Sequence, residues 1–300
     1  MGRHAYLIMA HQDFYTLEKI VELLDDERND IYIHIDKKVN NFDFNLWKKK
    51  VNKSNIYFMD KRIDVRWAAP SSIKVELELL EYAIKKKYEY YHLISGADLP
   101  IKTQNYIHDF FDNNKGKEFI GFNNIDKDRY KAKYYYYLAE RTPRNKNILH
   151  YICIGITKIS ILIQKIIKVD RLKNKNITIG RGPNWFSITH ELAKNLVSCK
   201  DEIINMYKYT QFCDEIFVQT YIINHYDNYK NIIYNFNNEY ESCLRYVDWN
   251  RGWPYTFTIE DYDEIMNSNK LFARKFNSNT DKKIIDKIYS HLQEEQKIKI

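Results

Sequence analysis

Two neighbouring cations and two neighbouring acids are the residue types in this chain that could carry group-transfer chemistry. Arg274 and Lys275 stand between phenylalanines in "FARKF". Arginine offers a planar fork to phosphate oxygens and lysine a point charge, so the pair could hold a diphosphate if the chain bends; otherwise it is a surface pair. Asp214 and Glu215 stand in "CDEIFVQT". One such carboxylate could deprotonate an attacking hydroxyl, whereas the alternative is an acidic first turn that stabilises a helix dipole.

Polar residues also follow three predicted strands. His11, Asp36 and Asp98 come at the ends of apolar runs that predict strands one, two and four. In an open parallel sheet, ligands bind outside the carboxyl ends of the strands. Asp36 in "HIDKK" could therefore accept hydrogen bonds from a uracil or a ribose, although an aspartate that caps a turn would leave the same pattern.

The common phosphate-binding motifs are missing from the sequence. It contains neither a Walker loop nor G-x-G-x-x-G. Two D-x-D matches occur, "DKD" at 126–128 and "DYD" at 261–263, and neither follows a predicted strand. We therefore expect no metal ion, and we expect that fixed cations of the protein neutralise a bound phosphate.

The elements that must position these residues alternate along the first hundred residues. Strand patterns at 5–10, 30–36, 55–60 and 90–96 are separated by helical patterns, the strongest at 71–87. This order predicts an α/β fold with a mostly parallel sheet. No linker divides the chain, so we expect one domain over 1–300. Its parts would be a nucleotide-binding half (1–111), a variable basic segment (112–180), an acceptor and catalytic half (181–280) and a C-terminal helix (281–300).

The composition limits the classes of binding partner but does not select one of them. The 300 residues carry a net charge of +7, which suits phosphorylated substrates, anionic lipid headgroups or other polyanions. No nucleic-acid-binding motif accompanies the charge, so we expect no nucleic-acid partner. The four cysteines form no C-x-x-C pair, which favours a reducing compartment. The apolar stretch 148–169 contains lysines, which argues against a membrane-spanning helix. It predicts a helix that either packs on the core or lies on an anionic membrane.

Seven stretches together resemble glycosyltransferase family 14, which includes core 2 and I-branching β-1,6-N-acetylglucosaminyltransferases and peptide O-xylosyltransferases. In order between residues 5 and 276, they are "AYLIMAHQ", "IYIHIDKK", "HLISGADLPIKT", "NWFSIT", "DEIFVQT", "LRYVDW" and "LFARKF". The resemblance implies a GT-A-like single domain. It also implies inverting transfer of a sugar, N-acetylglucosamine or xylose, from a UDP-sugar to a glycan hydroxyl, without a metal or other cofactor.

The same resemblance implies roles for individual residues. Glu215 would be the catalytic base, and Arg274 and Lys275 would stabilise the β-phosphate of UDP in place of a metal. Further residues would surround the UDP-sugar or line the acceptor cleft. The first group is His11, Asp36, Trp67, Asp98 and Arg251, and the second is Asn184 and Trp185.

The sequence also departs from the animal members of that family. It lacks their N-terminal signal anchor and their many cysteines. These departures favour a cytoplasmic bacterial enzyme of surface polysaccharide synthesis that acts on a lipid-linked acceptor and contacts the inner face of the plasma membrane through 148–169. The alternative is a non-catalytic carbohydrate-binding protein on the same scaffold, with tyrosines as stacking platforms. Retention of both the acid and the basic pair argues against that alternative.

Overall fold

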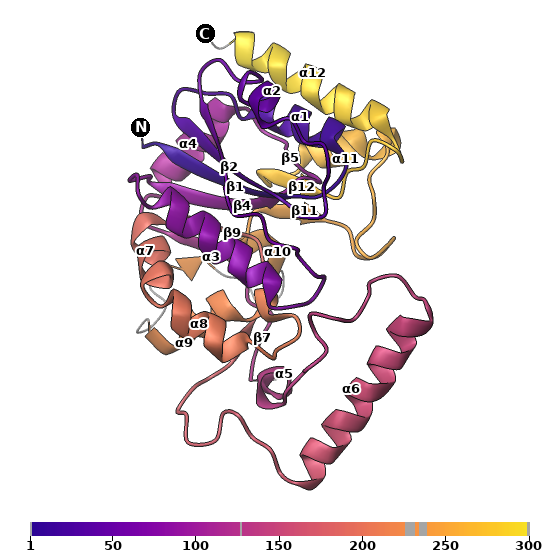
Figure 1. Cartoon of the computed structure of the whole chain (residues 1–300). Helices are drawn as coiled ribbons and strands as arrows, with labels where there is room; N and C mark the ends of the chain where they lie inside the picture. Colours follow the sequence, from indigo (N-terminus) through magenta and orange to yellow (C-terminus); the bar gives the residue numbers. More distant parts are fainter. Residues whose placement is uncertain (1, 127, 226–231, 234–238, 299–300) are drawn as a thin grey trace.

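A mixed, mostly parallel sheet forms the centre of the computed structural model, which describes residues 2–126, 128–225, 232–233 and 239–298 (Figure 1). Its strand order is β10-β6-β9-β4-β1-β2-β3. Strand β9 runs antiparallel to both of its neighbours, and the other pairs are parallel. The bounds are β1 His4–Ala10, β2 Asn29–Ile35, β3 Asn55–Phe58, β4 Tyr90–Ser95, β6 Glu118–Ile120, β9 Phe186–Thr189 and β10 Ile232–Ile233. The α/β class and the parallel strands that were predicted from 5–10, 30–36, 55–60 and 90–96 are confirmed.

Helices cover both faces of the sheet. The helices and 3₁₀ turns are α1 Phe14–Leu23, α2 Phe44–Lys48, α3 Ser71–Ala83, α4 Gln104–Asn113, α5 Arg129–Lys133, α6 Ile148–Ile166, α7 His190–Ser198, α8 Lys200–Tyr207, η1 Cys213–Glu215, α9 Phe217–His225, α10 Glu239–Ser242, η3 Ile259–Asp261, α11 Tyr262–Asn267 and α12 Lys282–Ile298. One core packs α1, α4 and α12 against the sheet, and the other packs α3, α7 and α9 against the opposite face.

Strand β1 illustrates why the sequence makes a buried central strand. Tyr6 and Ile8 point into one core, whereas Ala5 and Leu7 point into the other, and all four side chains are fully buried. Successive side chains of a strand alternate between faces, so a run of apolar residues can fill both layers at once. Burying a large aliphatic side chain contributes about 1.5–3 kcal/mol. The near-continuous apolar run therefore indicates a strand that is covered on both sides.

A small second sheet brings the C-terminal segment to the end of β4. It consists of β11 Arg245–Val247, β12 Phe272–Arg274 and β5 Asp98–Pro100, in the order β11-β12-β5. In the antiparallel β12–β5 pair, Arg274 lies opposite Asp98. A two-stranded sheet of β7 Asn124–Ile125 and β8 Gly180–Arg181 lies beside α9. These two small sheets carry the middle and C-terminal residues toward the strand ends where the sequence predicts a site.

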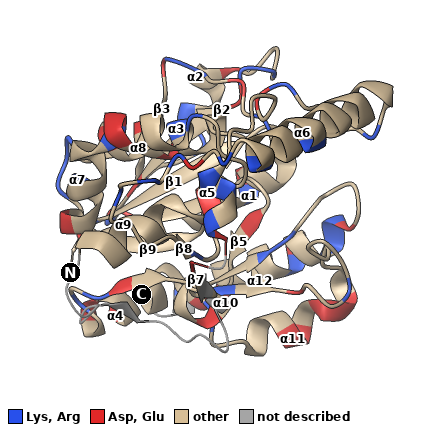
Figure 2. Ribbon diagram, turned by 90° about the horizontal axis from the view of Figure 1, so that it is seen from below, with Lys and Arg blue, Asp and Glu red and all other residues tan. Residues whose placement is uncertain are grey.

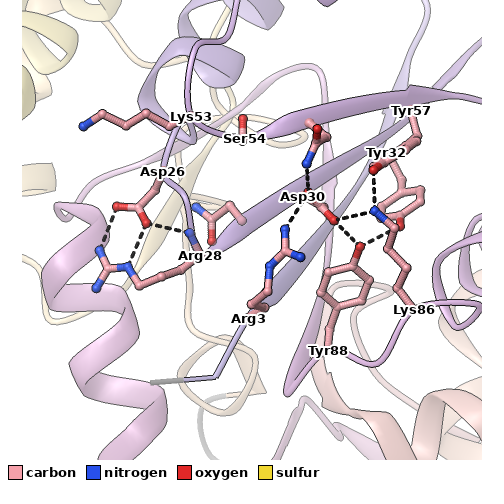
Figure 3. A network of polar contacts seen from close by, with 12 residues as sticks. Arg3, Asp26, Arg28, Asp30, Tyr32, Lys53, Ser54, Tyr57, Lys86 and Tyr88 are labelled. Carbon is pink, nitrogen blue, oxygen red and sulfur yellow. Dashed lines mark hydrogen bonds and ion pairs between the residues drawn. The ribbon is translucent and has the colours of Figure 1, made fainter.

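A polar network lies at the N-terminal ends of the central strands, opposite the carboxyl ends where a site is predicted (Figure 3). The buried carboxylate of Asp30, near the start of β2, accepts hydrogen bonds from Arg3 at 2.9 Å and from Asn55 at 2.8 Å. Lys86 forms an ion pair with the same carboxylate, and Tyr88 donates its hydroxyl to it. A buried charge is tolerated when several donors satisfy it. The network therefore fixes the starts of the strands and leaves their carboxyl ends for a ligand.

Helix α6 projects from the body as a long arm with few charged side chains (Figures 1 and 2). Only Cys153 and Gln164 of this helix are buried, so of the two alternatives for 148–169 the structure does not show a helix packed on the core. Large apolar side chains remain exposed on it, namely Ile148, Leu149, Tyr151, Ile152, Ile156, Ile159, Leu162, Ile163 and Ile166. By length and composition alone, α6 could cross a membrane.

Candidate active site

A cleft with a volume of about 810 Å³ opens where β1 and β4 end. Its wall includes residues from the ends of both strands, from the 66–68 loop, from 181–185, from η1 and from 274–277. A volume of roughly 300–1,000 Å³ is typical of small-molecule sites. Most of the sequence-predicted site residues line this cleft: His11, Trp67, Asn184, Trp185, Glu215, Arg274 and Lys275.

Glu215 reaches the cleft from the last position of η1, and its side chain is 33% exposed. Its Oε2 accepts hydrogen bonds from Nη2 of Arg181 at 2.7 Å and from Nε at 3.1 Å. Nη1 of the same guanidinium donates to Asp128 at 2.9 Å. Within the part of the chain that the structure describes, Oε1 of Glu215 has no hydrogen-bond donor. The arrangement orients a carboxylate by one oxygen and leaves the other available to accept a proton.

Glycines explain how Arg181 comes so close to Glu215. A Cβ on Gly182 would lie 1.9 Å from the carbonyl oxygen of Gly121, and one on Gly180 would lie 2.9 Å from the backbone of Gln219. Only glycine permits both close approaches. The backbone N–H of Gly182 also donates to the carbonyl of Glu215 at 3.0 Å. The sequence "GRG" is therefore the local feature that seats the arginine beside the acid.

Two further carboxyl groups in the wall of the cleft carry buried oxygens without hydrogen-bond partners among the described residues. Both carboxyl oxygens of Glu76 on α3 and Oδ1 of Asp214 are buried and unpaired. Burial raises the pKa of Glu76 well above its ordinary range, with a further contribution from Asp214. Burial, followed by the charge of Glu215, raises the pKa of Asp214 to about 7. Burial thus disfavours the ionised form of Glu76 and of Asp214, and of the two acids in "CDEIFVQT" only Glu215 is partly exposed.

Cations gather at another part of the cleft wall. Nη1 of Arg274 forms an ion pair with buried Asp98 at 3.2 Å, and its guanidinium stacks 4.2 Å from the centre of the Trp185 ring. Arg144 and Lys275 line the same cleft. In the described ranges neither of these two has an ion pair. Burial lowers the pKa of Lys275, and the charges of Arg274 and Arg144 lower it further. Three cations that repel one another favour an anion between them.

His11 at the end of β1 is a neutral group in the same wall. Burial lowers its pKa, opposed by the charge of Asp36 and reinforced by Arg144, Lys38 and Lys275. A neutral imidazole can donate from one ring nitrogen and accept at the other. His11 is therefore suited to hydrogen bonding with a polar ligand.

Aromatic side chains form a third part of the wall. Trp185, Tyr240, Trp249 and Trp253 follow one another with neighbouring ring centres 6.2–6.4 Å apart. All four line the cleft, and Trp253 is 93% exposed. Trp67, which is 62% exposed, contacts Phe212 edge-on at 5.3 Å between ring centres. Rows of exposed aromatic rings offer apolar faces on which the carbon faces of sugar rings can lie.

Comparison with known proteins shows which family this chain belongs to. The family model "Branch: Core-2/I-Branching enzyme" matches residues 4–269, which is most of the chain. The chain belongs to the Core-2/I-Branching enzyme family. The description of the matched family names an enzyme. The recognition of family 14 from the seven sequence stretches is therefore confirmed.

Curated relatives of this Core-2/I-Branching chain are xylosyltransferases. Xylosyltransferase 2 of Rattus norvegicus is 20% identical over 309 residues, which cover 97% of this chain and 34% of that protein. Xylosyltransferase oxt of Drosophila pseudoobscura pseudoobscura is 22% identical over 82% of this chain and 28% of its own length. The chain thus spans about a third of the length of these relatives. The crystal structure of mouse xyloside xylosyltransferase 1 in its apo form covers 93% of this chain and 98% of that chain at 9% identity and a TM-score of 0.40, a likeness too weak to support a conclusion.

Three residues that the sequence suggested for the donor site of this Core-2/I-Branching chain lie outside the cleft lining. Asp36 is buried and accepts hydrogen bonds from the backbone of Lys38 and Val65, so it ties together two loops behind the wall. Asp98 is buried and supports Arg274. Arg251, a loosely aligned candidate, forms ion pairs with Asp248 and Asp261 and does not reach the cleft, because these acids hold its guanidinium on its own loop.

Sequence reasoning missed several residues of the cleft in this Core-2/I-Branching chain. Arg181 was not singled out, although its two flanking glycines signal a close backbone approach. Arg144 lies in the basic segment, where nothing distinguishes it from its neighbours. Glu76 is one of several acidic residues in an amphipathic helix, and only its position on the buried face of that helix distinguishes it from the others.

Proposed function

We propose that this chain is an inverting, metal-independent glycosyltransferase that moves N-acetylglucosamine or xylose from a UDP-sugar to a hydroxyl of a glycan acceptor. The observation that carries the proposal is the position of Glu215 in a cleft that also contains Arg144, Arg274 and Lys275. A transferase needs a base for the attacking hydroxyl and positive charge for the leaving diphosphate. Both are present in one cavity of suitable volume.

In the proposed reaction, Oε1 of Glu215 takes the proton of the acceptor hydroxyl while that oxygen attacks the anomeric carbon. The bond between the anomeric carbon and the β-phosphate oxygen breaks, and UDP leaves with the bonding electrons. Lys275 and Arg144 stabilise the charge that develops on UDP, and Arg274, oriented by Asp98, contributes to the same field. Arg181 orients Glu215 through its two hydrogen bonds, and the aromatic row from Trp185 to Trp253 offers a stacking surface for the acceptor sugar.

Release of UDP from a panel of UDP-sugars tests the proposal, because many transferases hydrolyse their donor slowly without an acceptor. Each donor is assayed with excess EDTA and, in parallel, with manganese. We expect one donor to be hydrolysed equally in both series. Release that requires manganese would contradict the role given to Arg274 and Lys275. UDP-sugar binding without turnover, even with acceptor glycans, would favour the carbohydrate-binding alternative.

Contact with an anionic membrane through α6 is part of the proposal. The exposed apolar residues of α6 accompany Lys158, Lys165 and Lys168, which suits a helix lying at the surface of an anionic bilayer. A spanning position is disfavoured, because residues on both sides of α6 bind each other: the N–H of Arg171 donates to the carbonyl of Lys133 at 3.1 Å. Flotation with vesicles tests this contact. The predicted location at the cytoplasmic face of the plasma membrane and a role in surface polysaccharide synthesis remain proposals.

A further inference from the structure

A second cavity, about 610 Å³ in volume, lies between α6 and the body. Its lining is dominated by carbon: Tyr136, Ala139 and Pro143 come from the segment that precedes α6, and Ile154 and Ile161 from the helix itself. Trp67, Ala68 and Phe212 line both this cavity and the catalytic cleft. The two hollows are therefore neighbours that share one wall.

Specific hydrogen bonds build the wall between α6 and the body. The buried amide of Gln164 accepts from the N–H of Tyr135 at 2.8 Å and donates to the carbonyl of Tyr135 at 2.9 Å. At the other end of the helix, His150 bonds to the carbonyl of Pro143 at 2.6 Å. Two attachments, one at each end, hold the helix at a set distance from the preceding segment. These hydrogen bonds therefore define the space between α6 and the preceding segment.

The two faces of α6 differ in what they meet. Ile154, Thr157 and Ile161 are partly buried and face the cavity, whereas Ile152, Ile159 and Ile163 are more than half exposed on other sides of the helix. Lys158 and Lys165 line the cavity and are exposed. Neither lysine forms an ion pair with the described residues. An apolar hollow with unpaired cations at its edge matches an aliphatic chain that ends in a phosphate.

We propose that this cavity binds the aliphatic chain of a lipid-linked acceptor, so that the chain runs from the bilayer surface under α6 and presents its sugar to Glu215. The inference rests on the proposed function, since it names the acceptor class for the same cleft. It follows from the wall shared by the two cavities, the exposed apolar face of the arm and the lysines at the edge of the hollow. The phosphate that joins lipid to sugar lies beside Lys158 and Lys165.

Fluorescence titration with cis-parinaric acid, a soluble chain with an anionic end, tests the cavity without any need to know the acceptor. We expect saturable binding at one site. Ile161→Asp places a charge in the hollow and should weaken binding at least about tenfold. The matched control, Ile159→Asp, makes the same change two residues away on an exposed part of the helix and should stay within about twofold. Alkyl glucosides below their micelle concentrations should displace the probe, with affinity rising about fourfold for each added methylene.

A second variant guards against loss of fold. Thr157→Trp fills the cavity without adding charge, and it should weaken parinaric acid binding while UDP affinity on the same sample stays unchanged. The inference is overturned if no saturable binding occurs, or if the variants at 157, 159 and 161 bind the probe equally. If the protein binds parinaric acid as expected but neither binds UDP nor hydrolyses a donor, the proposed function is overturned and the cavity is supported. The two failures are therefore distinguishable.

Discussion

Replacing Glu76 by glutamine should stabilise the protein at neutral pH. The side chain of Glu76 on α3 is fully buried in the wall of the cleft, and neither of its carboxyl oxygens has a hydrogen-bond partner among the described residues. The folded state therefore holds this carboxyl in its protonated form. In the unfolded chain the same group ionises with its ordinary pKa of 4.5. Folding at pH 7 must take up a proton, and glutamine, which has nearly the same shape, removes that requirement.

The sign and size follow from proton linkage. Because the pKa of Glu76 is raised in the folded state, its contribution to stability is fully present below about pH 4.5 and declines as the pH rises. The decline is about 1.4 kcal/mol per pH unit while the folded carboxyl stays neutral. The unfolded carboxyl is already half ionised at pH 4.5, so for a folded carboxyl that stays neutral the decline from pH 4.5 to pH 7 amounts to about 3 kcal/mol. The difference in unfolding free energy between Glu76→Gln and the native protein should grow by that amount over this interval.

Urea unfolding at a series of pH values from 4.5 to 7.5 measures this difference. The control is Glu81→Gln on the same helix, since Glu81 is 47% exposed and pairs with Lys200. Exposed ion pairs contribute about 0–1 kcal/mol, so this control should show a small change without a comparable slope. A constant difference between Glu76→Gln and the native protein across the series would refute the reasoning. It would mean that Glu76 is ionised in the folded state or meets solvent there.

The other predictions concern the cleft and the arm. Glu215→Gln should abolish donor-to-acceptor transfer and leave UDP binding, measured by calorimetry, within about twofold; full transfer by this variant would reject Glu215 as the base. Lys275→Ala and Arg144→Ala should each weaken UDP binding about tenfold or more, as expected for the loss of a hydrogen bond to a charged group. If both variants bind UDP as tightly as the native protein, neither residue belongs to the phosphate site. The double change Ile159→Asp and Ile163→Asp should abolish flotation with anionic vesicles but leave UDP binding intact; undiminished flotation would exclude this face of α6 as the contact.

The sequence predicted the elements of the first hundred residues well because period and burial agree there. Strands such as 5–10 are apolar on both faces, and the helix at 71–83 has a continuous apolar side. Prediction worsened in the middle of the chain. Whether the helix at 148–166 packs on the core or is exposed depends on what covers its apolar face, and periodicity cannot distinguish a covered face from an exposed one. The strand β6, which lies within the predicted variable segment, is only three residues long and gave no usable pattern.

The cleft residues were predictable to the extent that they follow strands or carry rare chemistry. Glu215, Arg274 and Lys275 stand in short stretches of mixed charge and aromatic character that the fold brings to one wall. Arg181 acts through an ion pair that joins residues 34 positions apart in the chain, which no local pattern encodes. Asp36 and Arg251 stay predictions for the donor site, and in the structure both hold loops together. A polar residue at a strand end or beside a tryptophan is also what a loop needs to hold itself together.

The backbone hydrogen bond between Arg171 and Lys133 closes the intervening arm at its base. Its two ends lie next to each other on the body, so the chain leaves and returns at nearly the same point. Replacing everything between them with a short loop would leave the central sheet, Glu215, Arg274 and Lys275 in place but would remove Arg144 from the cleft, whereas lengthening the segment would add little entropic cost to folding. Such a junction allows the length and apolar character of the segment to change without moving the central sheet, provided that Arg144 keeps its place in the cleft.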